Sequence, residues 1–190
     1  TIDARQVLYE WGGLNEALFR VINGWHSPVL DAIMLTASAL GHPNRYPFYL
    51  AFALWCSWRW PARLAPGNVV VFAVGFVLVS ALLVPMLKAG LDLTRPMAAL
   101  GASGVTLVGE PETSPAFPSG HAAFAVLAAA ALAPGTARAV RAVLLLFTIG
   151  VCLSRISVGA HFPADVLGAA LLSLAVVKAL RAAFRVESPR

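Results

Sequence analysis

Apolar runs that alternate with short polar connections are the main pattern of this chain. The clearest run, residues 68–87, has no charged side chain, and about 20 apolar residues allow a helix to cross the hydrocarbon core of a bilayer. Five further runs cover residues 28–40, 46–60, 118–133, 139–153 and 163–180. The pattern predicts an all-α, polytopic membrane helix bundle with about six transmembrane helices.

Two segments differ from these runs. Residues 2–22 place apolar side chains near helical spacing, with charged residues between them, which predicts an amphipathic interfacial helix along the membrane surface. Residues 89–117 form the longest polar connection and contain several glycines and prolines. We expect a loop with little regular structure there, of the kind that often covers a site. Residues 1–190 are interpreted as one integral-membrane domain.

The composition supports this class. Hydrophobic residues make up 59% of the chain and charged residues 12%, which differs strongly from a soluble domain. The net charge of +5 does not indicate a nucleic-acid partner, because the basic residues are dispersed between apolar runs. Cys56 and Cys152 lie inside apolar runs and are expected to pack as small apolar side chains. The oligomeric state is left open.

The basic residues also predict the orientation. Six spans place both termini on one side, and if that side is the cytoplasm, ten of the fourteen basic residues lie there, as the positive-inside rule favours. We therefore expect a multi-pass membrane protein, with residues 89–117 as a loop on the extracytoplasmic face. Only four basic residues remain on that face: Arg45, Lys88, Arg95 and Arg155.

Three short motifs converge on this outer side, and each lies at a predicted helix end. Three of the four outer cations belong to them, and the backbone N–H groups near Ser119 and Gly120 have no helical partners there. Cations beside such N–H groups predict an anion site that fits a tetrahedral phosphoryl group. The motifs cover Lys88 to Pro96, Pro118 to His121, and Ser154 to Asp165.

Two histidines in these motifs suit phosphoryl transfer. A neutral imidazole can attack phosphorus, while a protonated one gives its proton to the leaving oxygen. Because His161 and Asp165 are four residues apart, we expect them on one helical face. The carboxylate would then orient His161 as the nucleophile, in the manner of the hydrolase triads. His121 is the expected general acid.

The motifs closely resemble those of the type 2 phosphatidic acid phosphatase family, whose pattern is Lys-x6-Arg-Pro, Pro-Ser-Gly-His and Ser-Arg-x5-His-x3-Asp. All three are present without a departure. The resemblance implies a phosphohistidine intermediate on His161, support of it by Asp165, and protonation of the leaving group by His121. It implies that neither a metal nor another cofactor is needed, and that the phosphate is held by Lys88, Arg95, Ser119, Gly120 and Arg155.

Each motif residue also has an ordinary structural interpretation. Lys88 alone is typical of a side chain that snorkels at the end of a span, and Ser119 alone is typical of a helix N-cap. A site of two histidines and one carboxylate also fits a metal, although the neighbouring cations would repel it. His26 and His42 match no motif and are interpreted as structural or interfacial, and Asp31 is expected to pair with a neighbouring helix or to cap a turn.

The expected substrate is an amphiphilic lipid phosphate within the bilayer. Residues 18–34 resemble the small bacterial undecaprenyl-diphosphate phosphatases of the family, which favours undecaprenyl diphosphate. The alternatives are lipid A phosphates, phosphatidylglycerophosphate or phosphatidic acid, or transfer of the phosphoryl group to another lipid. A lipid-phosphate carrier or flippase would use the same cations without chemistry.

Overall fold

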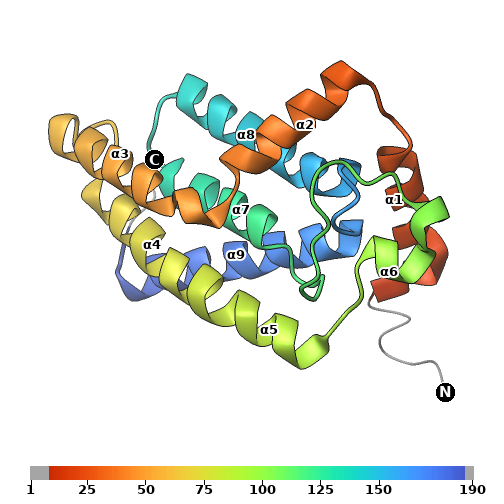
Figure 1. Cartoon of the computed structure of the whole chain (residues 1–190). Coiled ribbons are helices and arrows are strands. Elements are labelled where there is room, and N and C mark those ends of the chain that lie inside the picture. Colours follow the sequence, from red (N-terminus) through yellow and green to blue (C-terminus); the bar gives the residue numbers. More distant parts are fainter. Residues whose placement is uncertain (1–8, 187–190) are drawn as a thin grey trace.

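The computed structural model describes residues 9–186, and all its regular elements are helical (Figure 1). The elements labelled η are 3-10 helices, apart from η4, which is a π-helix. In chain order the elements are η2 (Trp11–Gly13), α1 (Leu14–Asn23), α2 (Pro28–Leu40), η3 (Pro43–Arg45), α3 (Tyr46–Arg59), α4 (Pro66–Phe76), η4 (Val77–Leu83), α5 (Val84–Leu91), α6 (Pro96–Leu100), η5 (Ala102–Gly104), α7 (Gly120–Leu132), α8 (Arg138–Ser157) and α9 (Pro163–Ala183).

The all-α membrane bundle is confirmed. Three helical segments of the described chain are long and apolar enough to cross a membrane, namely Pro66–Leu100, α8 and α9. Two further helices, α2 and α7, are apolar but have only 13 residues each. The described structure therefore does not confirm the count of about six spans.

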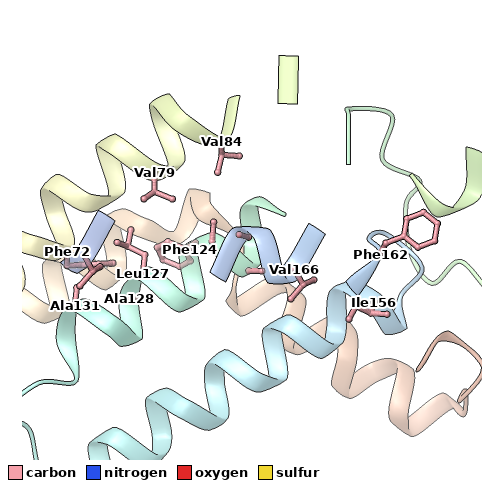
Figure 2. Close-up of a cluster of buried hydrophobic side chains, with 14 of the residues drawn as sticks. Phe72, Val79, Val84, Phe124, Leu127, Ala128, Ala131, Ile156, Phe162 and Val166 are labelled. Carbon is pink, nitrogen blue, oxygen red and sulfur yellow. The ribbon is translucent and has the colours of Figure 1, made fainter. Parts of the chain in front are cut away.

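Helix α7 forms the centre of the bundle and packs against α4, α8 and α9. It is apolar on all sides, which is typical of a helix surrounded by protein. Its alanines let neighbouring helices approach closely, and Phe124 and Leu127 fill the space between them with no exposed surface. Figure 2 shows these side chains beside Phe72 and Val79 of the adjoining α4–η4 segment. The packing of this core fixes the position of α7 in the bundle and therefore that of its N-terminus, where the second motif lies.

The amphipathic helix predicted over residues 2–22 is present but shorter than expected in its described part. Residues 2–8 lie outside the described range, and the helix begins only at Leu14, because Gly12 and Gly13 adopt positive φ angles of 64° and 94°. Such angles interrupt a right-handed helix and are favourable for glycine. Helix α1 packs against α8 and α9. Its buried Asn15 accepts a hydrogen bond from the backbone N–H of Ala164 at 2.9 Å, which attaches α1 to the start of α9.

The first and last described residues lie at opposite ends of the bundle. Tyr9 contacts Asp165 in the first turn of α9, whereas the described chain ends just beyond Ala183 at the other end of that helix. Figure 1 likewise shows α1 and the C-terminal end of α9 at opposite ends of the bundle. The expectation that both termini lie on one side is therefore wrong for the described residues. Helices α2 and α3 explain the difference, since they pack against different helices, α8 and α4, and each is shorter than a full crossing.

The loop predicted over residues 89–117 is more ordered than expected. Helix α5 extends to Leu91, and α6 and η5 follow within the loop. Two backbone hydrogen bonds attach the segment to the bundle, from Val108 to Val158 at 3.1 Å and from Ala116 to Leu93 at 2.8 Å. The segment therefore lies across the end of the bundle where α5 and α8 end and where α7 and α9 begin.

Candidate active site

The three motifs meet at this end of the bundle. The backbone N–H of Ser119 donates to the carbonyl oxygen of Asp165 at 3.1 Å, which joins the second motif to the third. The Ser119 hydroxyl accepts from the N–H of Ala122 at 3.5 Å, so Ser119 is the N-cap of α7 and Gly120 its first residue. As expected, the N–H of Ser119 has no partner within its own helix, but this donor is already used between α7 and α9.

His161 and Asp165 are in contact, but the predicted reason is wrong. His161 precedes α9, which begins at Pro163, a residue suited to the first helical position because it lacks an N–H. The two residues therefore do not share a helical face. Instead, Oδ2 of Asp165 accepts from the N–H of Phe162 at 2.9 Å and lies 3.2 Å from Nδ1 of His161. A single carboxylate oxygen thus caps the helix and orients the imidazole.

Arg95 and Arg155 are buried beside this histidine, with 7% and 5% of their surfaces exposed. Nη1 of Arg95 lies 3.3 Å from Nε2 of His161 and donates to the carbonyl of Ala160 at 2.8 Å. The guanidinium also contacts both the backbone and the hydroxyl of Ser114. Nη1 of Arg155 lies 2.5 Å from the Ser38 hydroxyl. Both guanidinium groups are therefore held in fixed orientations by several hydrogen bonds.

Glu112 lies between the two arginines, and the sequence did not single it out. Its Oε2 lies 2.7 Å from Nη2 of Arg95, and its Oε1 pairs with Nη2 of Arg155. Although burial acts in the opposite direction, the arginine charges lower the pKa of Glu112. A carboxylate that bridges two buried guanidiniums marks a position suited to an anion.

Arg155 has one further donor at this position. Among the described residues, its Nε is one of two buried side-chain polar atoms without a hydrogen-bond partner, the other being the Ser80 hydroxyl. A buried donor without an acceptor is costly. An oxygen of a phosphoryl group beside Arg155 would supply that acceptor.

Lys88 and His121 complete the set of motif side chains. The ammonium of Lys88 donates to the carbonyl of Pro115, in the loop that precedes the second motif. The ring of His121 makes an edge contact with His42 at a centroid distance of 4.9 Å. The charges of Arg155, His161 and Arg95 all act on His121, so the structure brings every predicted site residue to one end of the bundle.

His161 is nearly inaccessible and faces cations. Burial, together with the charges of Arg95 and Arg155, holds the pKa of His161 well below its ordinary value of 6.5. The imidazole is therefore neutral near neutral pH. With a proton on Nδ1 to donate to Asp165, its Nε2 carries a lone pair, as a nucleophile requires.

Two further polar residues outside the motifs, Tyr9 and His42, contact predicted site residues. Tyr9 donates to Oδ1 of Asp165 at 2.9 Å, and His42 lies against His121. No periodicity or motif identifies either residue, since tertiary contacts alone bring them to the site. Asp31 pairs with Nδ1 of His26 at 2.8 Å, so its partner comes from the connection before α2 and not from a neighbouring helix.

The described residues contain no group of side chains suited to bind a metal ion. Within residues 9–186, no group of three or more histidine, cysteine, aspartate or glutamate side chains is arranged to hold an ion. The metal-free mechanism itself stays a prediction.

Comparison with known proteins gives a consistent result. Residues 68–188 match the model of the PAP2 superfamily. LpxE from Aquifex aeolicus has a similar structure, with a TM-score of 0.75 and 28% identity over 88% of this chain and 94% of that chain. The first transmembrane PAP2-type phosphatidylglycerolphosphate phosphatase from Bacillus subtilis shares the fold, with a TM-score of 0.69 and 20% identity over 96% of this chain and 90% of that one.

A comparison with the curated proteins yields no match. The family model covers more than half of the chain, and the similar LpxE structure covers nearly all of it. The chain belongs to the PAP2 superfamily, as its three motifs predicted, and is a membrane phosphatase.

Proposed function

We propose that the protein releases phosphate from a lipid headgroup through a phosphohistidine intermediate on His161. One observation carries the proposal: Arg95 contacts both Nε2 of His161 and the carboxylate that bridges to Arg155. A phosphoryl group that replaced this carboxylate would be held by both guanidiniums beside the nucleophilic nitrogen. Such positioning is the main requirement of phosphoryl transfer.

In the first step, the lone pair on Nε2 of His161 forms a bond to phosphorus. The bond between phosphorus and the lipid-side oxygen breaks, and this oxygen keeps the electron pair and takes a proton from His121. The Nδ1 proton remains hydrogen-bonded to Asp165, whose charge balances the positive charge that develops on the imidazole. Lys88, Arg95 and Arg155 stabilise the charge on the phosphoryl oxygens, assisted by the N-terminus of α7 at Ser119 and Gly120.

In the second step, water replaces the lipid. His121, now neutral, takes a proton from the water as its oxygen bonds to phosphorus, the bond to Nε2 breaks, and inorganic phosphate leaves. For a diphosphate substrate the products are a lipid monophosphate and phosphate. Water is the second reactant, and neither step requires a redox partner.

Undecaprenyl diphosphate is the proposed substrate, with undecaprenyl phosphate as the product. The site lies at the end of an apolar bundle, where a lipid can present its headgroup while its chain stays in the bilayer. The similar phosphatase from Bacillus subtilis is named for phosphatidylglycerolphosphate, so that lipid is the principal alternative. Lipid A phosphates, phosphatidic acid and phosphotransfer to an acceptor lipid are the others.

The proposed location is the bacterial inner membrane, with the site on the periplasmic face and residues 1–190 as one domain. The distribution of described basic residues supports this orientation, since the end opposite the site holds more of them. The opposite end has Arg59, Arg63, Arg138, Arg141, Lys178, Arg181 and Arg185, whereas the site end has Arg20, Arg45, Lys88, Arg95 and Arg155.

A panel assay tests the proposal. Phosphate release by the purified protein is measured with undecaprenyl diphosphate, phosphatidylglycerophosphate, phosphatidic acid and a lipid A phosphate, with and without an acceptor lipid and with a chelator. We expect the fastest release from undecaprenyl diphosphate, no dependence on the acceptor or the chelator, and no release by His161→Asn. A carrier would bind the lipids without releasing phosphate, and equal turnover by His161→Asn would remove the nucleophile assignment.

A further inference from the structure

Asp165 has a third donor that does not belong to any motif. The hydroxyl of Tyr9 donates to Oδ1 of Asp165 at 2.9 Å, across a separation of 156 residues in the chain. The other oxygen, Oδ2, is the one shared by His161 and the N–H of Phe162. Asp165 has no exposed surface, so these protein donors define the orientation of its carboxylate.

The ring of Tyr9 is held by two phenylalanines of the site. It makes edge contacts with Phe117 at a centroid distance of 6.3 Å and with Phe162 at 6.1 Å. Phe117 directly precedes the second motif and also packs on Gly168, where a Cβ atom would come within 2.3 Å of its ring. In the sequence, Phe162 directly follows His161 and precedes Asp165. Aromatic packing therefore positions the Tyr9 hydroxyl between the second motif, which follows Phe117, and the third motif, which contains Phe162.

We propose that Tyr9 is a positioning residue for phosphoryl transfer, which fixes the Asp165 carboxylate so that Oδ2 faces Nδ1 of His161. This inference rests on the proposed function of the same site. A carboxylate held at one oxygen can rotate, whereas one held at both oxygens cannot. The hydrogen bond from Tyr9 also stabilises the ionised carboxylate, which has to balance the charge that develops on His161.

The charges around Asp165 are consistent with this role. His161 faces it from the α8–α9 connection, Arg95 from the start of α6, and Lys88 from α5. Burial and the neighbouring carboxylate of Asp165 raise the pKa of Tyr9, so its hydroxyl stays protonated as a donor. Tyr9 is thus a neutral donor beside the neutral imidazole of His161, while Arg95 and Lys88 act on Asp165 through their charges.

Tyr9→Phe isolates the hydroxyl, because the ring that packs on Phe117 and Phe162 is kept. Since a hydrogen bond to a charged group is lost, we expect kcat to fall about tenfold to a hundredfold while KM changes less than about twofold. The acidic limb of the pH profile of kcat should move to higher pH. Tyr49→Phe is the matched control: its hydroxyl donates to the carbonyl of Leu40 at 3.0 Å, and its kcat and pH profile should match those of the parent protein.

A double-mutant cycle separates positioning from general loss of structure. If Tyr9 acts through Asp165, Tyr9→Phe should slow the parent protein but cause no further loss in an Asp165→Asn background. Equal losses in both backgrounds, or an unchanged kcat and pH profile in Tyr9→Phe, would overturn the inference. A parent protein that releases phosphate from no lipid would instead overturn the proposed function, so the two failures are distinguishable. Thermal unfolding of each variant confirms that folded proteins are compared.

Discussion

Nη1 of Arg95 lies 3.3 Å from Nε2 of His161, so the guanidinium that pairs with Glu112 also contacts the nitrogen that we propose as the nucleophile. The same side chain holds the Glu112 carboxylate and the backbone of Ala160. Arg95 therefore connects His161, the Glu112 carboxylate and the segment between α8 and α9.

Arg95→Lys should reduce kcat/KM by at least about a hundredfold, because an ammonium cannot reproduce the fork that contacts Ser114, Ala160 and an anion together. Steady-state kinetics with a lipid diphosphate measure the effect. Arg141→Lys is the matched control, since Arg141 is an exposed residue near the start of α8, at the opposite end of the bundle. A change of less than about threefold at Arg95 would contradict its place in the phosphate site.

Glu112→Gln should strengthen anion binding. Phosphate has to displace the Glu112 carboxylate from Arg95 and Arg155, and the amide removes the competing charge with little change in size. We expect orthovanadate to inhibit the variant at about threefold to tenfold lower concentration than the parent. Glu110→Gln, at an exposed position two residues earlier, should leave inhibition unchanged. Weaker inhibition of Glu112→Gln would indicate that the carboxylate mainly holds the arginines in place.

His161 should remain neutral below its ordinary pKa of 6.5, with its proton on Nδ1, because burial and the arginine charges lower its pKa. Nitrogen NMR of the labelled imidazole measures the tautomer and the midpoint, with His161→Asn to assign the signal. Since the unfolded histidine titrates near 6.5, the contribution of its neutral burial to the free energy of unfolding is present above that pH and is lost as the pH falls. A midpoint at or above 6.5 would contradict the assignment.

His121→Ala should affect substrates unequally. A general acid matters most when the leaving oxygen is a poor leaving group. The leaving group of a lipid diphosphate is a phosphate anion, which is stable without a proton, whereas that of a phosphomonoester is an alkoxide. Loss of His121 should therefore slow the reaction of phosphomonoesters more than that of diphosphates. The ratio of kcat/KM for the two substrate types, variant against parent, measures this difference, because kcat/KM does not include the hydrolysis of the phosphohistidine that both types share. The same factor for both types would argue against His121 as the proton donor.

Much of the fold and of the site could be predicted from the sequence, because apolar length and motif spacing are local signals. The apolar runs predicted α7, α8 and α9 to within a few residues. The contact between His161 and Asp165 was predicted for the wrong reason, since Pro163 begins the helix after His161 and Asp165 reaches back as a cap. Spacing alone does not distinguish these two geometries.

Glu112 and Tyr9 could not be predicted, for a different reason. Each is a single polar residue in an irregular or boundary segment, without periodicity, and each reaches the site through contacts distant in sequence. The same limit applies to the topology. Charge counting assumes that every apolar run is a full crossing, whereas α2 and α3 are short helices that pack on different partners.

The most direct test of the central claim is to trap the phosphoryl group on the protein. The purified protein is mixed with a lipid diphosphate labelled at its terminal phosphate, quenched with base to preserve phosphohistidine, digested and analysed by mass spectrometry. The mechanism predicts label on His161, more of it in a variant that slows the second step such as His121→Ala, and none in His161→Asn. Rapid phosphate release with label on a different residue, or in His161→Asn, would contradict it.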